Sequence, residues 1–490
     1  MVAPEGEPWR ALASLAALAL FCRLLASLED ARPAWSLLAG LAFGASANAV
    51  VLASVIDLLA RFSGLPRAVC VLLALLLWLA QGAPYALAAY ASARLVPLGV
   101  PRTLALPAAL TVALAWVPQL FPWHVAATLL GALPLVQVAD LGGEALVGLV
   151  LTIAACTLAR AHAAPRRAAL VIALSCLAPA AYGLVRMAQI ERLRADAPTL
   201  RIGVVQSNVS VTEKHDARRA HDVLARLRQE TAALERAGAE VTLWGETAYP
   251  YPLPRDARRA PEDVRAVLAD GVRGPVLLGL ETYEGFDDDA RKYNSAWLVR
   301  ADGTLGDRAD KARLLAFGEY VPLWRWLPPL HARFRSGGFS AGAPGVVRVE
   351  TPAGTARLGV LVCYEDLFAS LARASLRRGA SALVNLTNDA WFGVSRVPAL
   401  HDLVARMRAI ELRRDLVRAV NTGVSSFTTA GGDTVVRTRP FERARFVAPV
   451  RLLSLHTPFA RFGDWVPPTC LGGLGLTLLR RRMRARPRAR

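Results

Sequence analysis

One cysteine of this chain stands apart from the other five. Cys363 lies in the polar part of the sequence, which contains no second cysteine that could form a disulfide with it. The residues before it, from Leu358 to Val362, are typical of a buried strand, and the apolar residues after it, from Leu367 to Leu376, have helical spacing. We expect an exposed sulfur on a turn near a helix N-terminus, where backbone N–H groups lower the pKa of a thiol. Cys363 is therefore a candidate nucleophile, and the alternative is a buried structural cysteine. The remaining cysteines all lie in long apolar stretches: Cys22, Cys70, Cys156, Cys176 and Cys470.

Two charged residues follow other strand-like segments. Glu246 comes after the apolar run Val241–Trp244, and Lys311 comes after Asp310. A carboxylate can accept the proton of a thiol and then serve in turn as acid and base. An ammonium can face the oxyanion of a tetrahedral intermediate, and its compact charge suits a single oxygen. Glu246, Lys311 and Cys363 could therefore perform acyl transfer together, and the alternative is that Glu246 and Lys311 are ordinary surface charges.

The composition indicates a membrane protein. The chain has 490 residues, of which 54% are hydrophobic, with a mean hydropathy of +0.33 and a net charge of +19. Its basic residues cluster beside apolar segments, above all in the tail 480–490, as expected for cytoplasmic flanks of membrane helices. The sequence has no lysine-rich or aromatic-interleaved run, so we expect no nucleic-acid partner; a nucleic-acid arm is the alternative for the tail. Only three of the 58 basic side chains are lysines: Lys214, Lys292 and Lys311.

Apolar segments long enough to span a bilayer fill the first part of the chain. About 20 apolar residues span a bilayer as a helix. We expect residues 1–191 to form a polytopic membrane domain, 192–458 a catalytic domain, and 459–490 a last, short span with the arginine-rich tail. The segment from Phe121 to Asp140 is short and interrupted by Pro and Gly, so we predict a re-entrant or interfacial piece there. The predicted spans are 9–28, 36–58, 68–93, 103–121, 142–160 and 167–188.

Arginines set the expected orientation. The tail and the link 160–167 should both be cytoplasmic, and one span separates each of them from residues 192–458. Both observations place that segment on the outer side of the membrane and the C-terminus in the cytoplasm. Counting back over six spans places the N-terminus outside as well.

Residues 192–458 alternate short apolar strands with helical segments, which predicts an α/β layered domain. The sequence has no metal-ligand spacing, phosphate-binding glycine loop or GxSxG motif, so we expect neither a metal nor a cofactor. The expected helices are 217–237 and 401–414. The expected strands are 202–205, 241–244, 276–280, 296–299, 358–362, 382–386 and 417–420.

The order Glu246, Lys311, Cys363 resembles the Glu-Lys-Cys triad of the nitrilase, or carbon–nitrogen hydrolase, superfamily. The neighbouring motifs resemble the apolipoprotein N-acyltransferase family, and with the apolar first half the resemblance covers nearly the whole chain. It implies an α-β-β-α sandwich beside a multi-span helical membrane domain. The motifs are 310–323, 363–365, 388–393, 405–411, 421–423 and 462–465.

The resemblance also implies a reaction. A phospholipid donates an acyl chain to Cys363 as a thioester, and the α-amine of a lipoprotein's diacylglyceryl-cysteine then takes it as an amide. It implies a multi-pass protein of the bacterial inner membrane whose catalytic domain faces the periplasm, and we expect a monomer. In this family Glu319 would orient Lys311. Tyr364 and Glu365 would support the turn of the nucleophile, and a packing or surface role is the alternative for all three residues.

Three residues are candidate contacts to the lipid substrates. Trp324 and Trp391 could be part of hydrophobic arms that dip into the interface, where tryptophan is favoured, or they could pack in the core. His215 stands where the family typically has a tryptophan associated with lipid access. Rival functions are a membrane-tethered amidase that hydrolyses its thioester, a paralogue that acylates another amine, and a transporter or scaffold with a relict domain.

Overall fold

A computed structural model describes residues 9–214, 216–285, 290–320, 338–351 and 354–485. The described chain divides into two compact units. The helical unit comprises 9–57, 65–189 and 457–485, and the sandwich unit comprises Leu58–Gly64 and Ile190–His456. Two of the four boundaries between the units fall inside helices, namely α3 (Val55–Ser63) and α8 (Pro165–Asp196).

Four helices of the described chain are long and apolar enough to cross a membrane: α2 (Pro33–Val51), α4 (Arg67–Leu95), α7 (Ala139–Ala159) and α8. Two further apolar helices are shorter: Ala11–Ser27, within α1 (Trp9–Ser27), and α5 (Arg102–Trp116). The unit ends with α15 (Val466–Ala485) after α14 (Pro458–Phe462). The expected span 36–58 is too long at its C-terminal end, because α2 ends at Val51 and the amphipathic α3 follows.

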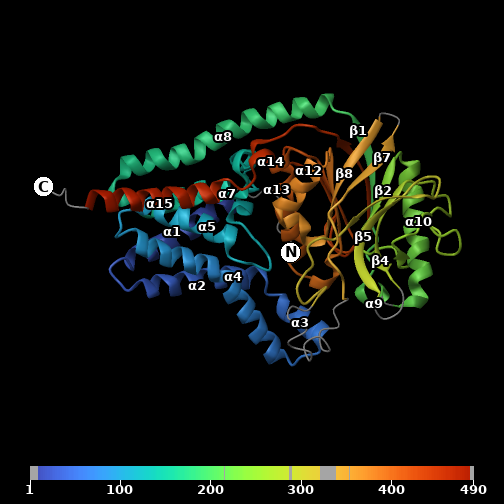
Figure 1. Cartoon of the computed structure of the whole chain (residues 1–490), viewed down its shortest axis with the longest axis horizontal. Coiled ribbons are helices and arrows are strands. Elements are labelled where there is room, and N and C mark those ends of the chain that lie inside the picture. Colours follow the sequence, from blue (N-terminus) through green and yellow to red (C-terminus); the bar gives the residue numbers. More distant parts are fainter. Residues whose placement is uncertain (1–8, 215, 286–289, 321–337, 352–353, 486–490) are drawn as a thin grey trace. The chain divides into compact units, whose positions relative to one another are not determined.

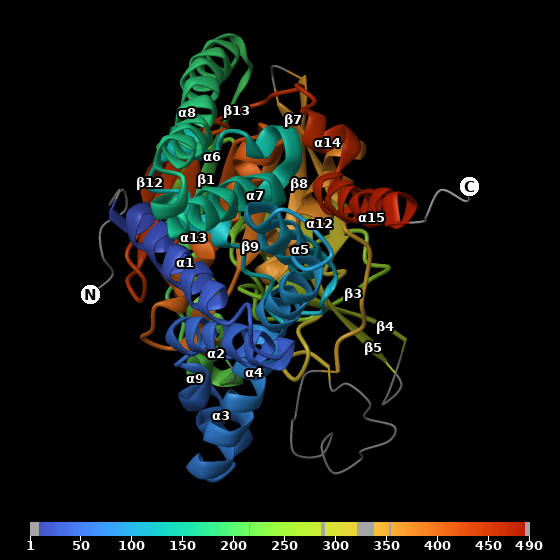
Figure 2. The ribbon, with the colours of Figure 1, turned by 90° about the vertical axis from the view of Figure 1, so that its left-hand side faces the viewer.

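Small residues bring two of these helices together. Helices α2 and α4 lie side by side (Figure 2). A Cβ at Gly44 would lie 2.8 Å from the Cα of Gly82, so the two backbones pack with no room for a side chain. Between α5 and α7 the chain forms only two short helices, η1 (Val125–Leu129) and α6 (Leu133–Val136), in the segment predicted to be interrupted.

The sandwich unit contains two sheets that pack face to face. The first has the strand order β13-β1-β2-β4-β5-β6 with β3 added beside β4, and the second has the order β12-β11-β10-β9-β8-β7. The first sheet consists of β1 (Thr199–Gln206), β2 (Val241–Trp244), β3 (Leu253–Pro254), β4 (Val276–Glu284), β5 (Arg291–Val299), β6 (Leu305–Asp310) and β13 (Ala444–Arg451). The second consists of β7 (Val346–Thr351), β8 (Gly354–Val362), β9 (Ala382–Thr387), β10 (Leu416–Val420), β11 (Ser426–Thr428) and β12 (Thr434–Arg437).

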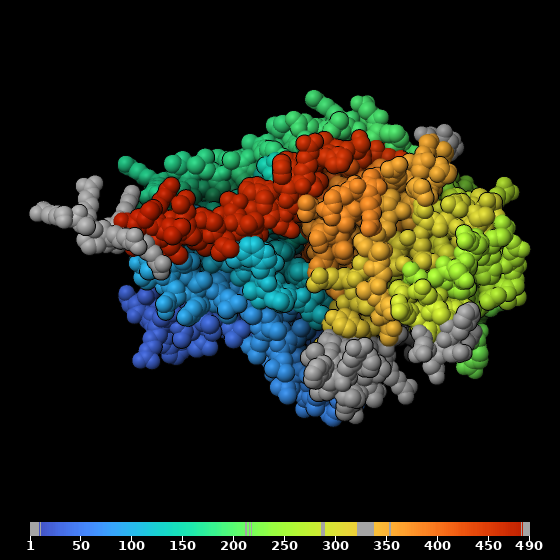
Figure 3. Space-filling view, viewed as in Figure 1, coloured from blue at the N-terminus to red at the C-terminus, as the bar shows by residue number. Residues whose placement is uncertain are grey.

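The core lies between the sheets, where Val204, Leu243, Val360 and Val384 are buried. Helix α10 (Ala220–Arg236) packs on the first sheet, and α12 (Ala369–Arg377) and α13 (Val397–Leu412) pack on the second (Figure 1). The predicted α-β-β-α sandwich is therefore confirmed. Figure 3 shows its yellow-green and orange halves packed directly against each other.

All seven predicted strands are present, as parts of β1, β2, β4, β5, β8, β9 and β10. Apolar runs did not reveal β3, β6, β7 or β11 to β13. The reason is clear in β6, where Asp307, Arg308 and Asp310 interrupt the apolar pattern. Helix α13 begins at Val397, earlier than predicted, and ends before Arg413, which has a left-handed φ of 50°.

The parallel strands place the predicted site residues at matching ends. Strands β1, β2 and β4 are mutually parallel, as are β8, β9 and β10. Glu246 follows β2 and Cys363 follows β8, so both lie at carboxyl ends of strands, where α/β sheets commonly bind ligands. Gly279 in β4 permits this, because a Cβ there would lie 2.3 Å from the carbonyl oxygen of Gly245, the residue before Glu246.

Candidate active site

A buried ammonium lies between two carboxylates. Lys311, which directly follows β6, is 1% exposed. Its Nζ donates to Oε1 of Glu246 at 3.1 Å and to Oε1 of Glu319 at 2.8 Å. Oε2 of Glu319 accepts the backbone N–H of Leu315 at 2.8 Å, which orients that carboxylate. The structure thus brings Glu246 to Lys311 and Glu319, from which it is 65 or more positions away in sequence.

Neutral donors fix the Glu246 carboxylate from two further sides. The side-chain amide of Asn294 on β5 donates to Oε1 at 2.6 Å, and the backbone N–H of Asn388, after β9, donates to Oε2 at 2.9 Å. Charge-assisted bonds of this kind are short and strong. Both carboxylate oxygens are occupied, so the orientation of Glu246 is determined by residues from three strands.

Cys363 begins a short 3₁₀ helix, η5 (Cys363–Leu367), and has a left-handed φ of 57°. Such a conformation in a non-glycine residue marks a constrained turn. The amide of Asn385 holds it by donating to the Cys363 carbonyl oxygen at 2.8 Å. The side chain is half-buried rather than exposed.

The expected low thiol pKa is wrong. Burial and the negative charge of Glu246 raise the pKa of Cys363 well above its ordinary value, although Lys311 acts in the opposite direction. A five-residue 3₁₀ turn supplies too little helix dipole to reverse this. The resting nucleophile is therefore a thiol, and a base must take its proton.

Glu246 and Lys311 are both charged at neutral pH, so Glu246 can act as the base that the Cys363 thiol requires. Burial alone would raise the pKa of Glu246, but the ammoniums of Lys311 and Lys214 outweigh burial and lower that pKa. Burial alone would lower the pKa of Lys311, but the thiolate that Cys363 becomes at high pH and the carboxylates of Glu246 and Glu319 raise it well above its ordinary value. At neutral pH the site therefore holds a carboxylate, an ammonium and a thiol, which is the starting state for nucleophilic attack with general-base assistance.

Glu365 and Tyr364 connect the turn of the nucleophile to the lysine loop. One Glu365 oxygen accepts the backbone N–H groups of Ala312 and Arg313 at 2.7 and 2.9 Å, and the other accepts that of Val362 at 2.8 Å. Burial raises the pKa of Glu365 to about 7 despite these bonds. The Tyr364 hydroxyl donates to the Leu314 carbonyl at 2.9 Å, and its ring lies 5.6 Å from Lys311 Nζ.

Of the three candidate lipid contacts, only Trp391 lies within the described residues. His215 and Trp324 lie outside the described residues. Trp391 is described, is 40% exposed, and packs against Phe62 with a ring-centroid distance of 4.6 Å. Its partner comes from α3, which sequence patterns did not connect with this loop.

Several residues of the site were missed from the sequence. Asn294 carried no chemical signal beyond its place in a strand, and Asn388 was noted only as the first residue of the motif 388–393. Lys214, at the end of α9 (Val211–Lys214), had a weak signal as one of three lysines. Its Nζ donates to the Thr247 hydroxyl beside Glu246, and Thr247 has a φ of 46°, which is strained for a β-branched residue.

A hollow of about 340 Å³, partly open to solvent, adjoins the carboxylate of Glu246. Lys214, Thr247, Ser207 and Asn421 supply polar groups to its lining, and Val209 is among the apolar ones. Among the described residues no cluster of three or more His, Cys, Asp or Glu side chains could hold a metal ion.

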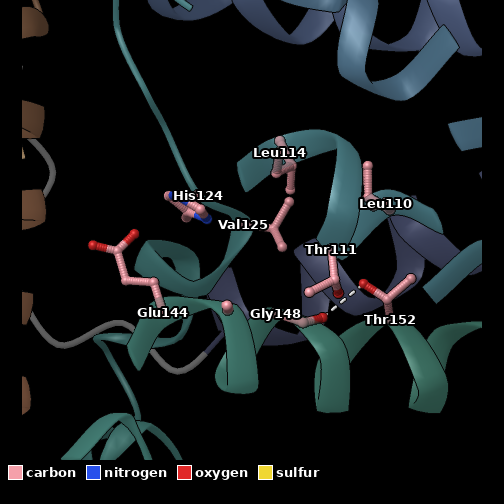
Figure 4. Close-up of a pocket in the computed structure, with 9 residues that line it drawn as sticks. Leu110, Thr111, Leu114, His124, Val125, Glu144, Gly148 and Thr152 are labelled. Atoms are coloured by element: carbon pink, nitrogen blue, oxygen red, sulfur yellow. Dashed lines mark hydrogen bonds between the residues drawn. The ribbon is translucent and has the colours of Figure 1, made fainter. Parts of the chain in front are cut away.

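A separate cavity lies within the helical unit (Figure 4). It is lined mainly by residues of α5 and α7, with Glu144 just after the break in α7 where Gly143 has a φ of 68°. Thr152 donates to the Gly148 carbonyl at 2.7 Å. Its lining residues include none of the predicted site residues, whereas Glu246 lines the hollow described above.

Two family models and several curated proteins match this chain. The carbon–nitrogen hydrolase family matches residues 201–450, about half of the chain, and the apolipoprotein N-acyltransferase N-terminal domain matches residues 3–157. Apolipoprotein N-acyltransferase of Geobacter metallireducens is 32% identical over 72% of this chain and 68% of its own length. That of Gloeobacter violaceus is 35% identical over 73% of this chain and 67% of its own length. That of Bdellovibrio bacteriovorus is 33% identical over 58% of this chain and 55% of its own length. Among solved structures, an amidase from Nesterenkonia is similar with a TM-score of 0.37 and 18% identity, over 52% of this chain and 91% of that one.

Replacing Glu365 by Gln should lower the Tm of the protein. An amide can offer only one oxygen, so its NH₂ group would face a backbone N–H and leave a buried donor unpaired, at a cost of roughly 1–3 kcal/mol. The pKa of Glu365 is about 7 in the fold, above its ordinary 4.5, so this carboxyl makes stability fall as pH rises between those values. Glu365→Gln should therefore lack the part of the fall in Tm between pH 4.5 and 7 that comes from the titration of Glu365. An unchanged Tm would contradict the role, and Glu262→Gln, at an exposed carboxylate, is the matched control.

Replacing Lys214 by Met should slow the alkylation of Cys363 by iodoacetamide roughly tenfold at neutral pH, because Glu246 loses a charge that keeps it a base. The carboxylate form is present above its pKa, so the acid limb of the pH–rate profile should move to higher pH. The matched control is Lys292→Met, since Lys292 is exposed on β5. Equal profiles for both variants would contradict a role for Lys214.

Proposed function

The chain belongs to the apolipoprotein N-acyltransferase family of carbon–nitrogen hydrolases, and from this premise we propose how its residues transfer an acyl chain. The enzyme is an acyltransferase that acts on lipoproteins. We propose that Cys363 carries the chain from a membrane phospholipid to the α-amine of the N-terminal diacylglyceryl-cysteine. The observation that supports this most directly is the Lys311 ammonium, 3.1 Å from the Glu246 carboxylate, beside the thiol.

In the first half-reaction Glu246 takes the thiol proton while sulfur attacks the ester carbonyl carbon of the donor. The carbonyl oxygen becomes an oxyanion that the Lys311 ammonium stabilises. The C–O bond then breaks, and Glu246 returns the proton to the leaving alkoxide. The products are a lysophospholipid and a thioester on Cys363.

In the second half-reaction the acceptor amine attacks the thioester carbon, and Glu246 takes a proton from its nitrogen. Lys311 again stabilises the oxyanion. The C–S bond breaks, the sulfur recovers a proton from Glu246, and the chain leaves as an amide. In this scheme Glu319 keeps the ammonium in place, because its Oε1 accepts a hydrogen bond from Lys311 Nζ at 2.8 Å.

Both substrates are lipids, which accounts for the apolar helices. Extracting an acyl chain into water costs ~0.8 kcal/mol for each CH₂ group exposed, so an enzyme anchored in the bilayer avoids that cost. We propose the bacterial inner membrane as its location. The arginines of the tail and of the link 160–167 support a cytoplasmic C-terminus and a periplasmic sandwich unit.

Wild-type protein incubated with acyl-labelled phospholipid should acquire a label on Cys363 that hydroxylamine removes, because thioesters react with hydroxylamine. Cys363→Ala should acquire none, whereas Glu246→Gln and Lys311→Met should acquire it roughly 10²–10³-fold more slowly. The matched control is Cys176→Ala, which removes a thiol from α8 and should label normally.

A wild-type protein without label, or a Cys363→Ala protein with the normal label, would overturn the assignment. Adding a diacylated peptide should then discharge the thioester as an amide. Discharge by water alone, with release of free fatty acid, would favour the membrane-tethered amidase instead.

A reporter enzyme fused after Arg490 should behave as cytoplasmic. The same reporter inserted after Gly285, in the sandwich unit, should behave as periplasmic. These results follow from the arginine-rich flanks, which resist transfer across the membrane. The reverse pattern, or the same side for both reporters, would contradict the orientation.

A further inference from the structure

A buried histidine connects the two turns that hold the nucleophile and its base. His401, on α13, is 4% exposed. Its Nε2 lies 2.8 Å from Oδ1 of Asp366, and its Nδ1 lies 3.1 Å from Oδ1 of Asp389. Both aspartates are fully buried, and the mechanism above uses none of these three residues.

The geometry determines the charge of this histidine. A neutral imidazole has one N–H donor and one bare nitrogen, which would face a carboxylate lone pair in either tautomer. Both ring nitrogens face carboxyl oxygens here, so with Asp366 and Asp389 ionised both nitrogens donate and the ring is an imidazolium. Consistently, although burial alone would lower the pKa of His401, the charge of Asp366 outweighs it and raises that pKa to about 9.

The surrounding charges balance only with a positive histidine. Arg418 on β10 donates to Asp366 and lies 3.6 Å from Asp402, which in turn accepts from Arg437 at 3.0 Å. The acids and bases of this buried cluster then number three each. We call it the His401 cluster: Asp366, Asp389, His401, Asp402, Arg418 and Arg437.

Each aspartate bonded to His401 is next to a residue of the site. Asp366 belongs to the turn η5 that begins with Cys363. Asp389 follows Asn388, whose backbone N–H donates to Oε2 of Glu246 at 2.9 Å. One connection from nucleophile to base, besides that through Glu365 and Lys311, therefore passes through this imidazole.

We propose that His401 is a positioning residue, which clamps the Cys363 turn to the Asn388 turn and so fixes the thiol relative to the Glu246 carboxylate. The inference rests on the proposed roles of Cys363 and Glu246. It goes beyond them, because it assigns a task to a group that touches no substrate. Displacing reacting groups by about 1 Å can slow a reaction by roughly 10²-fold, so loss of the clamp should appear in the rate rather than in binding.

The test measures how fast iodoacetamide alkylates Cys363 in the full-length protein, with mass spectrometry of the Cys363 peptide as the readout. This assay needs no lipid, so it stands even if the proposed acyl transfer fails. His401→Gln should alkylate roughly 10- to 100-fold more slowly at pH 7.5. In acyl transfer kcat should fall by a similar factor while KM for the phospholipid stays within about twofold. The matched control, His221→Gln on the exposed face of α10, should match wild type in both assays.

Two further measurements separate positioning from general loss of stability. Asp389→Asn should slow alkylation as His401→Gln does, and the double variant should be no slower than the slower single one, because both break the same link. The imidazolium is present below its pKa and lost above it. Its facing groups are Asp366 from η5, Asp389 from η6 (Asp389–Phe392) and Arg418 from β10. The ratio of wild-type to His401→Gln rates should therefore fall towards one as pH rises through about 9.

Wild-type alkylation by a folded His401→Gln protein, or additive effects in the double variant, would overturn the inference. If His401→Gln does not fold, Asp389→Asn decides: a normal alkylation rate in that variant contradicts the clamp. Failure of the lipid assay alone, with alkylation slowed as expected, would count against the proposed function and leave the clamp in place.

Discussion

The site depends on one buried ammonium. Lys311 is almost fully removed from water, where an unpaired charge would be very costly, so its two carboxylate partners are a condition of the fold and a resource for the chemistry. Glu246 and Glu319 come from distant parts of the chain, and the sheet order and the loop after β6 must bring them to the same atom. The close approach at Gly279 and the donors Asn294 and Asn388 serve that same requirement.

The protonation states that follow explain why the reaction needs a base. Burial keeps the Cys363 thiol protonated, whereas Lys311 stays an ammonium in spite of burial because the Glu246 and Glu319 carboxylates hold it. A free thiolate would be more reactive, but it would stand permanently beside the Glu246 carboxylate. The protein instead keeps the proton on sulfur until Glu246 removes it, so that negative charge develops only as the tetrahedral intermediate forms, opposite the ammonium that stabilises it.

Arginine and lysine have different tasks in the sandwich unit. Arg414 is buried and donates to the carbonyl oxygens of Ala380 and Leu455, which uses several N–H groups of one planar head. Arg194 binds both oxygens of Asp415 at 3.0 and 3.2 Å. Guanidinium suits these several simultaneous bonds, whereas Lys311 must present a compact charge to one oxygen. The scarcity of lysine in the chain is therefore informative about the site, since two of its three lysines lie there.

The sequence by itself determined the two kinds of segment, the seven most apolar strands and the positions of Glu246, Lys311 and Cys363 at strand ends, because those features depend on local hydrophobic pattern and spacing. The motif order was enough to indicate the α-β-β-α architecture by resemblance. Three features were determined only by the tertiary structure. They are the raised pKa of the Cys363 thiol, the hydrogen bonds to both carboxylate oxygens of Glu246, and the His401 cluster. Burial and ion pairing join residues that are tens to hundreds of positions apart, as Asn388 and Glu246 are, and no local pattern records which distant group will be the neighbour.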